Sequence, residues 1–92
     1  MKTNRYMIIS EHTAEDCRMA VEQFWQYHAG FLTRFEWGCY DNDHHAYAIV
    51  EAETHEQALM SVPPLFRPKA KAIRVRHLRP EGAKDHLHDK TK

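Results

Sequence analysis

Residues 35–50 read Phe-Glu-Trp-Gly-Cys-Tyr-Asp-Asn-Asp-His-His-Ala-Tyr-Ala-Ile-Val, and they set the middle of the fold that we expect. Two segments with β-forming character, residues 31–40 and 45–53, flank an acidic turn at residues 41–43. Asp and Asn favour turns because they tolerate left-handed backbone and bond it with their side chains. Both flanking segments alternate between two faces, as half-buried strands do. The stretch therefore predicts a β-hairpin at the centre of the chain.

Upstream of this hairpin the sequence predicts one strand and one helix. Residues 5–11 form a short run of apolar and β-forming residues. Thr13 suits a helix N-cap, and apolar residues then recur at helical spacing from Ala14 to Ala29, where Gly30 supplies a stop. The first half of the chain is therefore expected to run strand, helix, strand.

Downstream of the hairpin we expect a second helix and a fourth strand. Thr54 and Gln57 have the spacing of a capping box. The helix should end near Val62, because the two prolines that follow cannot donate hydrogen bonds in a helix. Residues 70–78 then alternate apolar and charged side chains, which predicts a final strand.

This order of elements predicts an α+β fold of the ferredoxin-like βαββαβ type. We expect a four-stranded antiparallel sheet in the order 4-1-3-2, with two helices on one face. On element order and size, residues 5–79 resemble the dimeric α+β-barrel superfamily of small ferredoxin-like proteins. The Pro63-Pro64-Leu65 step after the second helix is similar to that of small uncharacterised bacterial proteins with this fold. The resemblance implies a homodimer formed through the helix-free face of the sheet.

The residues of the sheet predict the same partner. Whichever face the helices cover, the other keeps large apolar side chains: Tyr6 with Ile8 or Met7 with Ile9, and Tyr47 with Ile49 or Phe35 with Trp37. An open face this apolar usually marks an interface. A second copy of the chain is therefore the expected occupant of that face.

Length and composition narrow the class of protein. Ninety-two residues predict one domain over residues 1–79 and a polar tail over residues 80–92. Thirteen basic residues balance thirteen acidic ones, which argues against nucleic-acid and membrane-surface binding. No apolar run reaches the roughly 20 residues that span a bilayer, and the N-terminus lacks the apolar region of a signal peptide. Two cysteines make no disulfide framework, so we expect a cytoplasmic protein with reduced thiols.

Four residues are candidate ligands for a transition metal: Cys39, His44 and His45 near the turn, and His12 after the first strand. Thiolate and imidazole suit zinc, nickel or copper. A three-residue loop would place Cys39 opposite His45, with β-carbons about 5 Å apart. A loop of two or four residues would place Cys39 opposite Ala46 instead. No C-x-x-C or H-x-x-x-H motif is present, so a buried cysteine beside two solvated histidines is the competing interpretation.

Three further residues are candidates for binding a small ligand: Arg74, Arg76 and Trp37. If the two arginines and Arg34 line the open sheet face, they would hold an anion in a dimer cavity. The alternative is an exposed charged surface or interface salt bridges. Trp37 belongs to an aromatic group that either stacks on a ligand or packs in the core.

Three functions follow from these candidates. The first is a small homo-oligomeric binding protein that holds a transition metal or small ligand near the hairpin. The second is a cofactor-free barrel-type enzyme, an isomerase or monooxygenase, in which His12 or His45 moves protons in a closed apolar pocket. The third is a structural or interaction module with a dry dimer face. A retained metal would support the first function and a closed pocket the second. The absence of both would support the third.

Overall fold

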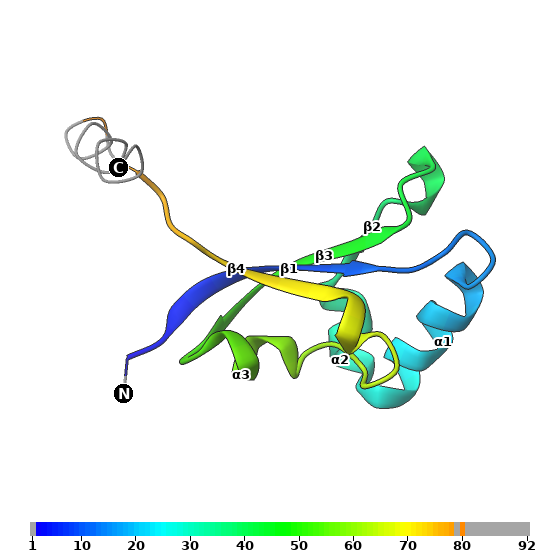
Figure 1. Cartoon of the computed structure of the whole chain (residues 1–92), viewed down its shortest axis with the longest axis horizontal. Helices are drawn as coiled ribbons and strands as arrows, with labels where there is room; N and C mark the ends of the chain where they lie inside the picture. Colours follow the sequence, from blue (N-terminus) through cyan, green and yellow to red (C-terminus); the bar gives the residue numbers. More distant parts are fainter. Residues whose placement is uncertain (1, 79, 81–92) are drawn as a thin grey trace.

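The computed structural model describes residues 2–78 and residue 80, and it shows an α+β fold. Within these residues, four strands form an antiparallel sheet: β1 (Asn4–Glu11), β2 (Glu36–Trp37), β3 (His45–Ala52) and β4 (Ala70–Val75). The strand order is β2-β3-β1-β4. Read from the opposite edge, it places the same strands side by side as the expected order 4-1-3-2. One side of the sheet carries the helices α1 (Cys17–Tyr27), α2 (Ala29–Arg34) and α3 (His55–Leu59) (Figure 1). The tail expected over residues 80–92 lies outside the described residues except for residue 80.

Strands β1 and β3 pair along their whole length. Asn4 lies opposite Ala52 at one end, and Glu11 lies opposite His45 at the other. The end of β1 and the start of β3 therefore meet at the same edge of the molecule. Beyond that edge the pairing continues by one more hydrogen bond, in which the His12 N–H donates to the His44 carbonyl at 3.0 Å.

Small side chains form the covered face of β3. Alternate residues of this strand are buried beneath the helices: Ala46, Ala48, Val50 and Ala52. Beside them on β1 lie the buried side chains of Tyr6 and Ile8. Small residues on a sheet let a helix approach closely, and Phe24 of α1 fills the space above them. The hydrophobic core therefore lies between the sheet and the helices.

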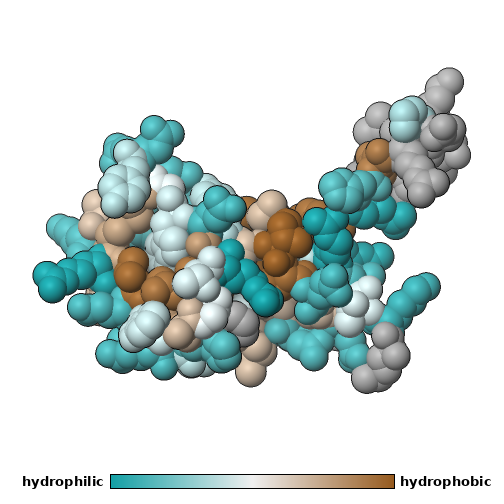
Figure 2. Space-filling view, turned by 180° about the vertical axis from the view of Figure 1, so that it is seen from behind, coloured by the Kyte–Doolittle hydropathy of each residue, from teal (hydrophilic) through white to brown (hydrophobic). Residues whose placement is uncertain are grey.

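The opposite face of the sheet is free of helices and partly apolar. Met7, Ile49 and Ile73 share one row across the three long strands. Ile49 is 38% exposed and Ile73 is 46% exposed. Seen from behind, hydrophobic side chains interrupt the polar surface in the middle of the molecule (Figure 2). No helix in the described part of the chain has the length and hydrophobicity needed to cross a membrane.

The strand predicted over residues 31–40 is mostly wrong. Residues 29–34 form α2 instead, and only Glu36 and Trp37 pair with β3. Leu32 on α2 and Phe35, the residue directly after it, explain the difference, because a turn of helix brings both onto the core. Burial of these two side chains in the core therefore outweighs the alternating pattern that favours a strand.

The predicted helix ends are partly confirmed. Thr54 caps α3 as expected, since its Oγ1 accepts a hydrogen bond from the Gln57 N–H at 3.0 Å. The Thr13 Oγ1 accepts a comparable bond from Asp16, but that bond closes a turn before α1, which begins at Cys17. Helix α1 also ends at Tyr27, short of the expected Ala29.

Candidate metal centre

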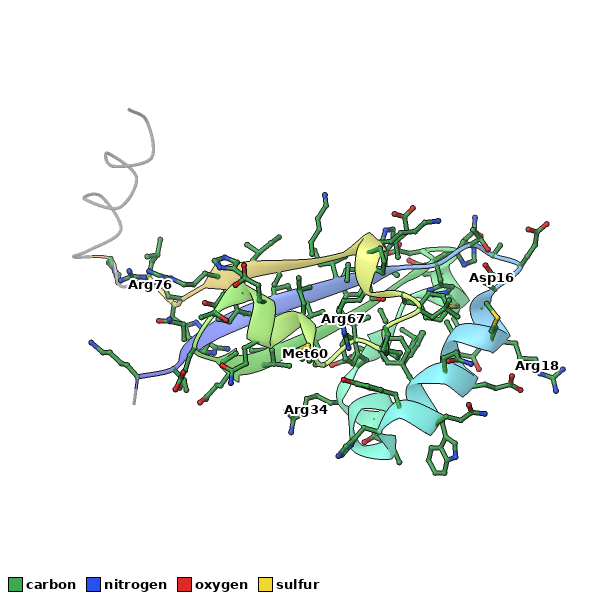
Figure 3. All side chains as sticks on the ribbon, turned by 60° about the horizontal axis from the view of Figure 1, so that its bottom comes forward. Asp16, Arg18, Arg34, Met60, Arg67 and Arg76 are labelled. Atoms are coloured by element: carbon green, nitrogen blue, oxygen red, sulfur yellow. The ribbon has the colours of Figure 1, made fainter. Side chains whose placement is uncertain are left out.

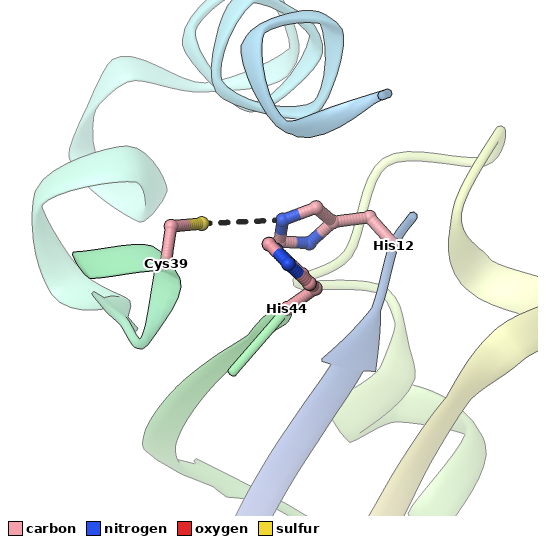
Figure 4. A group of neighbouring side chains, drawn as sticks. All are labelled: His12, Cys39 and His44. Carbon is pink, nitrogen blue, oxygen red and sulfur yellow. Dashed lines mark hydrogen bonds between the residues drawn. The ribbon is translucent and has the colours of Figure 1, made fainter. Parts of the chain in front are cut away.

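His12, Cys39 and His44 come together at the edge where β1 ends and β3 begins (Figure 4). Each offers one ligand atom, and these three atoms all lie within 4.8 Å of one another. Cys39 Sγ and His12 Nε2 are 3.3 Å apart. Zinc binds thiolate sulfur at about 2.3 Å and imidazole nitrogen at about 2.0–2.1 Å, so ligand atoms this close can share one ion. The structure therefore unites three of the four predicted metal ligands.

The connection between β2 and β3 positions two of the three ligands. It spans residues 38–44 and adopts neither of the expected hairpin registers, since Trp37 pairs with Ala46. Gly38 starts a 3-10 turn, and its carbonyl accepts hydrogen bonds from Asp41 at 2.9 Å and from Asp43 at 3.0 Å. A β-carbon at Gly38 would lie 2.7 Å from the Asp43 carbonyl oxygen. Only glycine therefore permits the close loop that returns the chain from Cys39 to His44.

His12 is the most buried of the three ligands, with 5% of its surface exposed. Its ring lies 5.7 Å from the Trp37 ring and 5.8 Å from the His44 ring, measured between centroids. Burial lowers the pKa of His12, and the neighbouring His44 and His45 lower it further. The ring is therefore held in the neutral form that binds metals.

His44 has one ring nitrogen engaged and one without a partner. Its Nε2 lies 3.1 Å from Asn42 Oδ1, an acceptor, so Nε2 carries the proton and donates. Its Nδ1 is buried and has no hydrogen-bond partner among the described residues. An unsatisfied buried nitrogen is costly, and a lone pair fixed by a bond at the other nitrogen is the usual state of a metal-binding histidine. Asn42 is suited to this place because it takes the left-handed conformation, with φ 59°.

Cys39 contacts a second thiol that the sequence did not single out. Its Sγ lies 2.7 Å from the Sγ of Cys17, which opens α1. Burial, and then the hydrogen bond from Cys17, raises the pKa of Cys39 to about 11. A metal ion would displace this proton, because thiolate is the binding form. The missed signal is a mirrored spacing: Cys17 follows His12 by five positions, as His44 follows Cys39.

His45 does not join the three-residue group. Its Nδ1 lies 2.5 Å from Asp43 Oδ1, and the Tyr47 hydroxyl donates to Asp43 Oδ2 at 2.5 Å. These bonds, the one from Tyr47 being the larger influence, lower the pKa of Asp43. Neighbouring residues at a strand start point to opposite faces. His44 and His45 are therefore separated, and His45 lies on the helix-free side opposite Glu11.

The three candidates for small-ligand binding do not meet. Arg74 lies opposite Tyr6 and so belongs to the helix side of the sheet rather than the open face, at the exposed edge of β4. Arg76 lies at the end of the molecule away from Asp16 and α1 (Figure 3). Trp37 packs on the Phe24 ring at 5.0 Å. Trp37 is thus part of the core and a wall of the metal centre.

A separate hollow of about 480 Å³ opens on the helix-free face of the sheet. Its lining residues come from β1, β3 and the segment around β2: Met7, Arg34, Glu36, Tyr47, Ala48 and Ile49. It is open to solvent, whereas the enzyme interpretation of the sequence predicts a closed pocket. Tyr47 lines the hollow and also donates to Asp43, which precedes His44 in the connection between β2 and β3.

Comparison of the chain with protein-family models, with curated proteins and with solved structures found no match in any of the three. The geometry of the site is therefore what indicates the function.

Proposed function

We propose that this protein binds a transition metal ion, of the class of zinc, nickel or copper, through His12, Cys39 and His44. The observation that carries this proposal is the convergence of their three ligand atoms within 4.8 Å at a partly buried edge of the sheet. Imidazole and thiolate together select these metals over magnesium and calcium, which prefer oxygen ligands.

The surroundings of the three residues favour metal binding over chance proximity. Burial lowers the pKa of His12, which favours its neutral ring, and the buried Nδ1 of His44 has no hydrogen-bond partner among the described residues. A neutral imidazole has one nitrogen lone pair, which a metal ligand needs. Cys39 must be reduced to bind, so we further propose a cytoplasmic setting for the protein.

Metal content of protein purified without an affinity tag tests the proposal, together with thermal unfolding in the presence of added ZnCl₂. A ligand at 100 times its Kd adds about 2.7 kcal/mol of stability. For a domain of this size each kcal/mol raises Tm by roughly 4–8 °C. We therefore expect Tm to rise by about 10–20 °C under that condition.

The adjacent histidines provide a matched control. His44→Gln and Cys39→Ser should lose most of the Tm shift, whereas His45→Gln should keep it, because His45 lies outside the group. Equal shifts in His44→Gln and His45→Gln, or no metal retained by the unaltered protein, would remove the proposal.

We also propose that the chain is a ferredoxin-like protein that dimerises as the dimeric α+β-barrel superfamily does. The strand order and the single helical layer support this, as does the exposure of Ile49 and Ile73 on the helix-free face. Sedimentation should show a dimer that Ile49→Glu dissociates. Leu65→Glu is the control, since Leu65 is 58% exposed in the loop after α3. A monomer at all concentrations would overturn this proposal.

The open hollow favours a second candidate function, a cofactor-free enzyme acting on a small organic substrate. Arg34 lines the hollow, and Asp43 holds His45 through Nδ1, which leaves Nε2 for proton transfer. Titration with benzoate, a small aromatic anion, tests it by NMR. Shifts at Tyr47 and Ile49 that Arg34→Gln abolishes are expected. Absence of binding at millimolar benzoate would count against this candidate.

A further inference from the structure

The ligand group has a fourth member within reach, the thiol of Cys17. Cys17 Sγ lies 2.7 Å from Cys39 Sγ, and Cys39 Sγ lies 3.3 Å from His12 Nε2. The four side chains come from two segments of the chain, and each segment supplies one imidazole and one thiol with four residues between them. One segment leaves β1 and enters α1, and the other joins β2 to β3.

We propose that Cys17 is the fourth ligand and that the site holds zinc in a closed Cys₂His₂ shell. This inference rests on the metal-binding function proposed above and specifies its metal and its type. Two sulfurs and two nitrogens around one ion are typical of tetrahedral zinc. The two negative charges of the thiolates also neutralise the charge of Zn²⁺, and both imidazoles are neutral.

The distances are compatible with such a shell after a small movement. Zinc–sulfur bonds of about 2.3 Å and zinc–nitrogen bonds of about 2.0–2.1 Å, at tetrahedral angles, separate two sulfurs by about 3.8 Å and a sulfur from a nitrogen by about 3.5 Å. The contact between Cys39 and His12 is already near that value. The two thiols must part by roughly 1 Å, which a rotation about either side-chain χ1 provides.

Cys17 is the first residue of α1, and its Sγ contacts Cys39 Sγ across the gap between that helix and the connection from β2 to β3. It is half-buried, as are Cys39 and His44, while His12 is buried. The ion would therefore be partly enclosed, with Asn42 fixing the His44 ring from outside the shell.

A closed shell predicts a structural role for the metal. Four protein ligands leave no open position for a water or substrate, in contrast to catalytic zinc sites with three. The ion would join the start of α1 to the connection between β2 and β3. The backbone already joins the two segments at one point, where the His12 N–H donates to the His44 carbonyl at 3.0 Å, and the metal would add a cross-link from Cys39 to the start of α1.

Cobalt(II) substitution of the reduced protein tests the proposal, because each thiolate bound to Co²⁺ adds sulfur-to-metal charge-transfer absorption. The unaltered protein should show tetrahedral d–d bands and the charge-transfer intensity of two thiolates. Cys17→Ser should retain about half of that intensity and bind zinc at least about tenfold more weakly. Arg18→Ser is the matched control, since the Arg18 side chain is 92% exposed on the same helix turn.

Alkylation of the unaltered protein with iodoacetamide gives a second measurement that does not depend on how a variant folds. Zinc should protect both cysteines if both are ligands. Protection of Cys39 alone, with unchanged charge-transfer intensity in Cys17→Ser, would overturn the fourth ligand and leave the three-residue site standing. Failure of the unaltered protein to bind Co²⁺ or Zn²⁺ would overturn the proposed function itself.

Discussion

His12 and His44 are joined through their backbones as well as their rings. The His12 N–H donates to the His44 carbonyl at 3.0 Å, and the two imidazoles meet edge to face with centroids 5.8 Å apart. This bond continues the pairing of β1 with β3 by one step beyond Glu11 and His45. Because it uses main-chain atoms, replacing either side chain leaves it in place. Ligand variants should therefore test metal binding without first breaking the sheet.

Gly38→Ala should damage the metal centre although it removes no ligand. The added β-carbon would lie 2.7 Å from the Asp43 carbonyl oxygen, a backbone atom that cannot turn aside. We expect a loss of about 1–3 kcal/mol in the free energy of unfolding, as for other overpacked sites, and weaker zinc binding. Urea denaturation and zinc titration measure the two effects.

Gly30→Ala is the control for that substitution. Among the described residues its β-carbon would meet the His28 side chain alone, at 3.0 Å, and alanine favours the helix in which Gly30 lies. Stability and zinc affinity should both be kept. If the two alanine variants behave alike, the close approach at Gly38 is not what shapes the loop.

The metal-free protein should lose stability as the pH falls below about 6.5. Burial lowers the pKa of His12 from 6.5, so the folded protein binds fewer protons at this ring than the unfolded chain does. The stability contributed by neutral His12 is thus complete above the unfolded pKa and declines as the pH falls toward the folded pKa. Tm measured in EDTA from pH 7.5 downward follows the effect.

His12→Gln should flatten this pH dependence of Tm, since glutamine does not titrate. His77→Gln, at an exposed position after β4, serves as the control and should keep the wild-type slope. A slope in His12→Gln as steep as that of the unaltered protein would assign the effect to other groups.

Arg67 should contribute to stability by fastening the loop after α3 to α1. Its Nε and one terminal nitrogen donate to the Val62 carbonyl at 3.1 and 2.8 Å, and that nitrogen also donates to the Tyr27 hydroxyl at 3.2 Å. Arg67→Ala leaves a partly buried carbonyl without its partner, which costs about 1–3 kcal/mol. Arg18→Ala, which loses only an exposed pair with Glu22, should change stability by less than about 0.5 kcal/mol. Chemical denaturation measures the free energy of unfolding of both variants, and equal losses would contradict this role of Arg67.

Tyr47 should ionise later than an ordinary tyrosine. Its hydrogen bond to Asp43, and then its partial burial, raises the pKa of Tyr47 above 10.0. The stability that this bond contributes is complete below pH 10.0, and it is lost as the pH rises through the pKa of the folded protein. NMR of ¹³C-labelled tyrosine should show that the Tyr47 ring titrates at raised pH and that Asp43→Asn lowers this pH. Tyr40→Phe, at an exposed site, should leave that ring unchanged.

Several elements were predictable because their signals are local. The Thr54 side chain caps α3 through Gln57, which depends only on residues three apart. The alternation in residues 45–53 correctly marks β3, since every second residue from Ala46 onward is buried. The ligand types at His12, Cys39 and His44 were also visible, because their chemistry does not depend on the fold.

The hairpin was the part least accessible from sequence. Residues 31–34 alternate like a strand yet form α2, because packing Leu32 and Phe35, the residue directly after the helix, on the core outweighs the local pattern. The loop from Gly38 to His44 is longer than any considered, and its shape depends on a contact between Gly38 and Asp43.

The sequence by itself thus determined that one thiol and two imidazoles, Cys39, His44 and His45, lie close together near the middle of the chain. The tertiary structure alone decided which of them meet. The long pairing of β1 with β3 sets His12 beside His44 and turns His45 to the other face, and the packing of α1 brings Cys17 to Cys39. Contacts between residues far apart in the chain fix these choices, and a shift of one residue in strand register would reverse them.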